Sequence, residues 1–325
     1  MRNMVTRVQF TVVACLLAAL PLASCLLLAT AKPSTESVSP VELVRQAVNN
    51  EVASNRESNR RFMFKDVKKT AHLNQVKLIV ETKEATAGLL IANDGHPLSP
   101  EERKQEEARL QNYVRNPQEL NKKRKQEKED ADHTMRILQA LPDAFLYEPD
   151  GAEKGTEVLG RSGHELARLK FRPNPDYDPP SRVEQVLTGM TGYLLVDVPE
   201  KRIAQINATL EKDVGFGWGI LGHLDRGGRF LVQQADIGDR HWELTRMELS
   251  MTGKILLVKK LSIQSSDTFS DFRPVPADLT FAQGVEMLKK EADRASAARS
   301  RPLGRASERK QPSEEKAEVK SPGLH

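Results

Sequence analysis

The fold is decided by the stretch Tyr193-Leu194-Leu195-Val196-Asp197, which a short turn separates from Lys201-Arg202-Ile203-Ala204-Gln205-Ile206-Asn207. In the first segment Leu194 and Val196 alternate with Tyr193, Leu195 and Asp197, as the two faces of a half-buried β-strand require. Two such segments joined by a short turn predict a pair of antiparallel strands.

Similar alternation is found on both sides of this stretch. From Ala144 to Ile263 the sequence is typical of short strands joined by turns, and Phe62 and Phe64 belong to an earlier strand. Near Arg246 the alternation changes phase, which predicts a β-bulge or bend. Many antiparallel strands must curl or be covered to bury an apolar face. We therefore predict a mainly β protein with helices, of the α+β class: a curved antiparallel sheet or unclosed β-barrel covered by helices, over residues 60–290.

Capping boxes mark the helices expected around and within this sheet. Ser39-Pro40-Val41-Glu42 begins an N-terminal helix, which with its linker occupies residues 32–59. Ser99-Pro100-Glu101-Glu102 begins a strongly charged helical hairpin, residues 99–141, inserted between strands. Leu120 is the only large apolar residue of the middle of this hairpin, so we expect it to project into solvent. The last part, residues 291–325, is expected to be a disordered polar tail.

The first 31 residues are typical of a signal peptide. Arg2 and Arg7 form a positively charged n-region, and an uncharged run dominated by Val, Leu and Ala follows from Val8 to Ala31. Small residues at Ala29 and Ala31 favour cleavage there, which would leave a soluble mature protein beginning at Lys32. We therefore expect an exported protein of the periplasm or outer membrane.

Two alternatives for this N-terminal segment stay open. Leu22-Ala23-Ser24-Cys25 resembles a lipobox, in which Cys25 would be lipidated and become the mature N-terminus. The apolar run is also long enough for an uncleaved membrane anchor. Peripheral association with a membrane is therefore part of the expectation.

Composition excludes two classes of protein. Lys and Arg total 49 against 45 acidic residues, and these charges are interspersed, so no basic face with interleaved aromatics predicts nucleic-acid binding. The two cysteines, Cys15 and Cys25, both lie in the N-terminal apolar run, which excludes an internal disulfide framework in the mature domain.

No motif of established chemistry fits its context. Gly217 to Gly222 has the glycine spacing of a dinucleotide site, but another predicted strand follows where a helix is needed. Gly160-Arg161-Ser162-Gly163-His164 lacks the final glycine of a nucleophile elbow and is interpreted as a turn. The histidines are scattered without metal-ligand spacing. We therefore predict no catalytic residue, no metal and no cofactor, and do not expect a conventional enzyme.

The stretch from Tyr193 to Asn207, with Asp213-Val214-Gly215 after it, resembles the repeated strand phrase of the bacterial lipoprotein carrier and lipoprotein-sorting superfamily. In that phrase a strand ends in an acid, a turn follows, and the next strand carries apolar residues toward bound lipid. Segments such as Phe171 to Arg182 are similar to a family of uncharacterised exported bacterial proteins. The resemblance covers about residues 60–288 and implies an unclosed barrel with an apolar cavity for acyl chains.

These observations predict a non-catalytic envelope protein that binds a lipid or a lipoprotein acyl group in an apolar cavity. The candidate ligand-binding residues are large apolar side chains of the strands and of the glycine-rich bend: Leu194, Val196, Phe216, Trp218 and Trp242. An alternative is a structural or regulatory module that binds an envelope protein partner through the charged hairpin. A hydrolase whose catalytic groups converge from distant strands is a third hypothesis.

Overall fold

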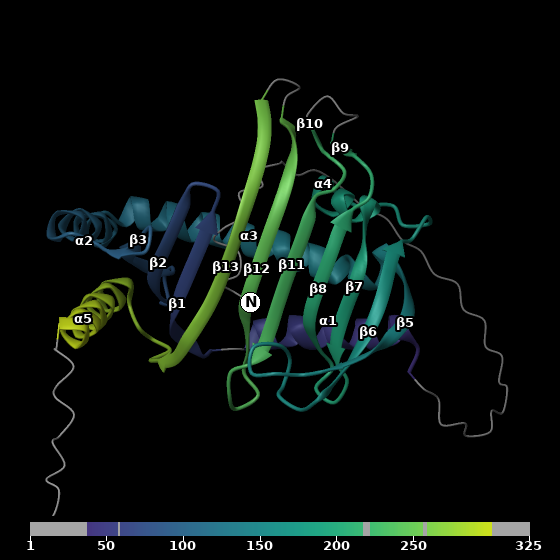
Figure 1. The fold of residues 1–325 in the computed structure, drawn as a ribbon, viewed down its shortest axis with the longest axis horizontal. Helices are drawn as coiled ribbons and strands as arrows, with labels where there is room; N and C mark the ends of the chain where they lie inside the picture. Colours follow the sequence, from purple (N-terminus) through teal and green to yellow (C-terminus); the bar gives the residue numbers. More distant parts are fainter. Residues whose placement is uncertain (1–37, 58, 217–221, 256–258, 301–325) are drawn as a thin grey trace, which may run out of the picture.

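The computed structural model describes residues 38–57, 59–216, 222–255 and 259–300 (Figure 1). Its helices are α1 (Pro40–Glu57), α2 (Pro100–Arg115), α3 (Pro117–Ala144), α4 (Arg182–Gln185) and α5 (Phe281–Ser300), with a 3-10 helix, η1 (Val186–Gly189). Its first strands are β1 (Arg61–Thr70), β2 (Leu73–Val80), β3 (Ala87–Asn93), β4 (His96–Pro97), β5 (Phe145–Lys154), β6 (Glu165–Pro173) and β7 (Met190–Asp197). The later strands are β8 (Arg202–Leu210), β9 (Val214–Phe216), β10 (Gly222–Leu224), β11 (Arg229–Asp236), β12 (Trp242–Ile255) and β13 (Lys259–Val275).

The strands form one antiparallel sheet, which confirms the predicted fold class. Its order is β4-β3-β2-β1-β13-β12-β11-β8-β7-β6-β5, and β9 and β10 pair beside the end of β12. The sheet does not close, because β4 and β5 lie at opposite ends of this order (Figure 1). The predicted bulge near Arg246 is confirmed: Gln233 pairs with Arg246 and Gln234 with Leu244, which leaves Thr245 as the extra residue.

Strand pairing defines two faces of the sheet, because residues opposite each other in an antiparallel ladder point to the same side. We call the face that carries Leu194 the first face, and the face that carries Tyr193 the second face. On the first face, the pairing runs through Leu194, Ile206, Val232, Met247, Asp267 and Lys68. On the second face, it runs through Lys170, Tyr193, Asn207, Leu231, Glu248, Ser266 and Lys69.

At the β5–β8 end, helices cover the first face. Val44 and Val48 of α1 and Leu138 of α3 pack with Leu194 and Val196 in the largest core cluster. Figure 1 shows both helices behind the strands of this end. The apolar spacing of α1 and the alternation of β7 therefore meet in one core, as binary patterning requires.

At the β1–β3 end, helices cover the second face instead. Met63, Leu78 and Leu89 pack there with Val285 and Leu288 of α5. Leu78 pairs with Lys65 and with Leu89, whereas the neighbouring Phe64 and Ile79 form a pair on the first face. The helices thus change sides between the two ends of the sheet.

The charged insertion does not stand out from the sheet as expected. Leu110 of α2 is buried in the core of the β1–β3 end, and Leu120 of α3 packs against the same core. From there α3 runs behind the strands to the β5–β8 end (Figure 1), where Leu138 and Leu141 are buried. A helix with few apolar residues can therefore still connect two cores, because those residues lie near its ends.

The insertion also contacts the outer edge of β3 through charged side chains. Glu106 accepts a hydrogen bond from the backbone N–H of Leu90 at 2.9 Å, and Glu127 accepts one from Thr86 at 3.0 Å. Arg109 donates to the carbonyl of Gly88 at 2.8 Å. These residues satisfy backbone groups that an edge strand would otherwise present to solvent.

Two further observations concern the ends of the chain. The helix α5 extends to Ser300, ten residues beyond the predicted boundary of the domain at 290. The predicted signal peptide, with Cys25, lies outside the described residues. In the part of the chain that the structure describes, no helix has the length and apolar character needed to cross a bilayer.

Candidate functional site

The predicted ligand-binding residues do not come together in one place. Leu194 and Val196 are 1% and 0% exposed, and they pack beneath α1 and α3. Trp242, at 4% exposure, belongs to another cluster, with Leu166 and Leu195. Because Leu195 lies between Leu194 and Val196 along β7, its side chain points to the opposite face.

The remaining two predicted residues, Phe216 and Trp218, lie at or beyond the end of the described part of β9. Phe216 is the last residue of β9 and pairs through its backbone with Gly222, but its side chain lies outside the described part of the structure. Trp218 lies outside the described residues altogether. The glycine-rich bend therefore cannot define the candidate site.

A different set of apolar residues forms a continuous strip on the first face. We call this set the aromatic strip; it lies in the middle of the sheet, between the two ends that helices cover. Its buried members are Phe62, Phe64, Ile79, Val232, Leu244 and Met247, and Phe230, Ile237, Phe269 and Phe272 pack against them. Each member comes from a strand or from the β11–β12 turn, and no described helix contributes to either cluster.

Ring contacts hold the aromatic strip together. The rings of Phe64 and Phe269 meet edge to face at 6.0 Å, and Phe272 lies 5.3 Å from Phe64. Phe230 also packs against the core of the β5–β8 end, so the strip is continuous with it. Alternation identified Phe62 and Phe64 in the sequence. Phe269 pairs with Asp66 just before an irregularity in the pairing of β13, and Phe272 lies within that irregularity, so only the register brings them to Phe64.

Polar groups interrupt the aromatic strip at defined positions. Asp66 and Asp267 are fully buried on the same face, and Lys68 Nζ lies 3.6 Å from the carboxylate of Asp267. A small number of placed polar groups within an apolar surface is typical of sites that orient an amphiphilic ligand.

One end of the strip carries a buried acidic pair. Glu81 accepts a hydrogen bond from the backbone N–H of Phe62 at 3.0 Å, and His241 lies 3.2 Å from Glu243. Burial, reinforced by the negative charge of Glu243, raises the pKa of Glu81 to about 8. The imidazole of His241 lies over the ring of Phe62, with 4.7 Å between ring centroids. The protonation of Glu81 is therefore linked to the apolar packing of Phe62 at this end of the strip.

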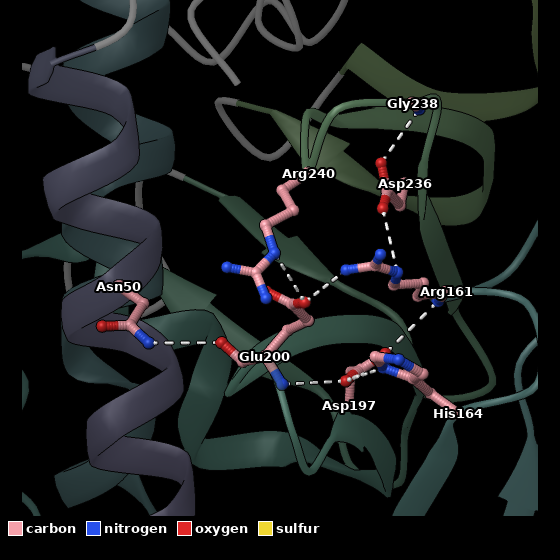
Figure 2. A network of polar contacts seen from close by, with 8 residues as sticks. All are labelled: Asn50, Arg161, His164, Asp197, Glu200, Asp236, Gly238 and Arg240. Carbon is pink, nitrogen blue, oxygen red and sulfur yellow. Dashed lines mark hydrogen bonds and ion pairs between the residues drawn. The ribbon is translucent and has the colours of Figure 1, made fainter.

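A network of ion pairs lies beyond His241 and joins two loops (Figure 2). Arg161, in the β5–β6 loop, lies 2.6 Å from Glu200 and 3.5 Å from Asp236. Glu200 also forms an ion pair with Arg240, at 3.4 Å. Arg161 thus connects the β7–β8 turn with the β11–β12 turn, which carries Ile237 and His241 of the strip region.

The β11–β12 turn has an unusual backbone. Gly238, Asp239 and Arg240 have φ values of 117°, 53° and 57°, and left-handed conformations are unfavourable for the two residues that are not glycine. The Asp236 carboxylate accepts a hydrogen bond from the N–H of Gly238 at 2.9 Å, and Asp239 lies 3.8 Å from Arg60. The ion pairs of Figure 2 hold this turn in place.

Asp197 is the buried centre of the network. Its carboxylate accepts hydrogen bonds from the backbone N–H groups of Glu200 at 3.0 Å and Arg161 at 3.3 Å, and lies 3.0 Å from His164 Nδ1. A histidine oriented by a buried carboxylate supplies two of the three members of a nucleophilic triad. Among the described residues no hydroxyl group is recorded at the other nitrogen of His164. The contacts of Asp197 therefore hold the β7–β8 turn and the β5–β6 loop together. The predicted turn at 160–164 is confirmed by the hydrogen bond from His164 N–H to the Arg161 carbonyl.

A buried ion pair fixes α1 to the sheet near this network. Arg202 makes two hydrogen bonds of 2.8 Å to Glu51, which also accepts the backbone N–H of Ile203 at 3.1 Å. The guanidinium lies 5.4 Å from the Trp242 ring, a distance within the range of a cation–π contact. Trp242 thus packs against the buried ion pair and does not present an open surface to a ligand.

Metal ligands and similarity to known proteins were the remaining possible indications of function. Within the described ranges, no group of three or more His, Cys, Asp or Glu side chains is placed to hold a metal ion. Comparisons of the chain with protein-family models, with curated proteins and with solved structures found no match.

Proposed function

We propose that the chain is an exported binding protein of the cell envelope, of the periplasm or outer membrane, that holds an acyl chain of a lipid or lipoprotein along the aromatic strip. The observation that carries the proposal is the strip itself: a continuous apolar cluster on one sheet face, to which no described helix contributes a residue. Its buried members are 2–8% exposed, so an acyl chain would bind by entering between them. The residues first predicted, Leu194 and Val196, are replaced in this role because they belong to the core under α1 and α3.

The dimensions and chemistry of the strip suit an extended apolar ligand. The strip crosses β2, β1, β13, β12 and β11, which at about 4.8 Å between neighbours gives a length of about 19 Å. Burial of apolar surface there would supply about 25 cal/mol per Å² before ordering costs. The polar groups of Asp267 and Lys68 would lie within reach of a headgroup or ester.

The alternative of a protein partner for the charged insertion receives less support. Glu106, Arg109 and Glu127, three of its charged residues, are already used against β3. Leu110 and Leu120 are used in the core. The insertion thus has a structural task that uses part of its charge.

Neighbouring residues of β11 provide a matched test of the binding face. Val232 lies in the aromatic strip, whereas Leu231 points to the second face. We expect Val232→Glu to abolish saturable binding of a fluorescent fatty acid and Leu231→Glu to leave it within about twofold, because only the first buries charge in the site. Equal loss in both variants, or in neither, contradicts the proposal. Circular dichroism and thermal unfolding of each variant report whether it folds.

Photocrosslinking keeps the proposal testable if Val232→Glu does not fold. A fatty acid that carries a diazirine should label peptides of β1, β2, β11, β12 and β13 in the unaltered protein. Label confined to other strands overturns the assignment.

Export is checked separately by the intact mass of the purified protein, which distinguishes a start at Lys32 from an acylated Cys25.

A further inference from the structure

The second face of the sheet is open and basic outside the part of the β1–β3 end that helices cover. Its outward side chains on β6, β11, β12, β13 and β1 are largely hydroxyl, amide and basic groups. The exposed basic residues are Lys69, Lys170, Arg172, Arg229, Arg246, Lys254 and Lys260. Ser250, Thr252, Ser262, Gln264 and Thr268 lie exposed among them, whereas the large apolar side chains of this row, Tyr193 and Leu231, are only half-exposed.

The acidic residues of this face are already neutralised. Arg168 lies 2.9 Å from Asp150 and 2.8 Å from Glu153, and Arg246 bonds to Glu248. By contrast, five basic residues have no ion-pair partner among the described residues: Lys69, Lys170, Arg229, Lys254 and Lys260. This face therefore carries a net positive charge, although the charges of the whole chain almost balance.

Register places these cations across the whole width of the open face. A single row of paired residues begins at Lys170 on β6 and ends at Lys69 on β1. Six strand spacings of about 4.8 Å separate them, or about 29 Å along the sheet. Arg229 lies on the same face of β11, two residues before Leu231 of this row. Lys254 pairs with Lys260 near the end of the β12–β13 ladder.

Charges spread so widely fit an extended anionic surface better than a small anion. A compact anion such as phosphate needs several donors converging within hydrogen-bond distance, and these side chains lie on different strands without such convergence. A surface of anionic lipid headgroups attracts each nearby Lys or Arg by about 1 kcal/mol without requiring fixed contacts. Exposed hydroxyl and amide groups can hydrogen-bond to headgroups at the same time.

We infer that the second face of the sheet is a docking surface for an anionic lipid bilayer. The aromatic strip lies on the opposite face, so docking leaves it unobstructed. The inference does not depend on acyl-chain binding, because it rests on charge and exposure of the second face alone.

Vesicle co-sedimentation tests this surface. The purified exported protein is mixed with phosphatidylcholine vesicles, with and without about 30% phosphatidylglycerol to supply negative charge. Binding is expected only to the anionic vesicles and should be lost in about 0.5 M salt, where charges are screened within a few ångströms. A triple variant, Lys170→Glu, Arg229→Glu and Lys260→Glu, should bind anionic vesicles about tenfold more weakly or less.

A second triple variant controls for net charge. Lys104→Glu, Arg124→Glu and Lys125→Glu change three exposed basic residues of α2 and α3, with the same change in net charge. This control should keep most of the vesicle binding. Equal loss in the two triple variants, salt-resistant binding, or binding to a soluble anionic polysaccharide without binding to vesicles overturns the inference. All three proteins should bind the fluorescent fatty acid equally, which separates this result from that of the proposed function.

Discussion

The two ends of the sheet are built from the same kinds of residue but in opposite arrangements. At the β5–β8 end α1 and α3 cover the first face, and a buried pair, Arg202 and Glu51, fixes α1. At the β1–β3 end α2 and α5 cover the second face, and a more exposed pair, Arg103 and Asp293, joins them. Because the covered face changes, the middle of the sheet has an apolar first face and a polar second face, and α3 runs behind the strands from one covered end to the other (Figure 1).

Charged substitutions in the two cores should give the largest effects and should differ between the ends. Leu194→Asp places an unpaired charge among the 20 buried residues of the larger cluster, and we expect loss of cooperative unfolding. Leu288→Asp affects a cluster of 12 buried residues. It should detach α5 and expose β2 and β3 while β6–β8 stay protected.

Hydrogen exchange of both variants measures this difference. Protection that disappears everywhere in Leu288→Asp would show that the two ends fold as one unit. Lys170→Asp, on the exposed second face, serves as a charged control that should leave protection unchanged.

The helix anchors provide the next comparison. Glu51→Ala leaves the buried Arg202 guanidinium without its partner, and we expect a loss of about 3–5 kcal/mol in the free energy of unfolding. Urea denaturation measures it. A loss below about 1 kcal/mol would mean that α1 is held by its apolar side chains alone.

The acidic pair at the end of the aromatic strip should make stability depend on pH. The pKa of Glu81 is raised from 4.5 to about 8, so the folded state binds this proton more tightly than the unfolded state. The stabilisation is complete below pH 4.5 and is lost as pH rises through 8.

Glu81→Gln should remove this dependence. Relative to the unaltered protein, its melting temperature should rise by a few degrees between about pH 5 and pH 8.5. Glu286→Gln, at an exposed position of α5, is the control and should show no such trend. A Glu81→Gln difference that stays constant with pH contradicts the assignment.

The exposed anchor should give the smallest effect. Arg103 bonds to Glu107 and Asp293, but side chains in solvent gain little from such pairs, and Arg103→Ala should lower the free energy of unfolding by at most about 1 kcal/mol. Urea denaturation beside Glu51→Ala provides the measurement. A loss as large as that of Glu51→Ala would remove the distinction between the two anchors.

Local patterns in the sequence predict the strands well but not which side the helices take. Alternation placed Leu194 and Val196 on one face and Leu195 on the other, and the phase change near Arg246 located the bulge. The change of covered face depends on how α2, α3 and α5 pack, and alternation is compatible with a helix on either side.

The candidate site was harder to predict for a related reason. Phe64 and Phe269 are about two hundred residues apart, and their contact depends on the register of β1 with β13. Arg161, Glu200 and Asp236 likewise meet only because three turns gather at one end of the sheet. No short-range pattern identifies such partners.

The contacts between the insertion and β3 have a consequence for the chain in solution. Glu106, Arg109 and Glu127 occupy backbone positions that a strand from another molecule would otherwise use. At the opposite edge, β5 carries an irregularity between Pro149 and Ala152, which also disfavours a regular partner. The charged helices thus protect the β3 edge against self-association. We expect a chain without them to pair with further copies at β3 and to aggregate.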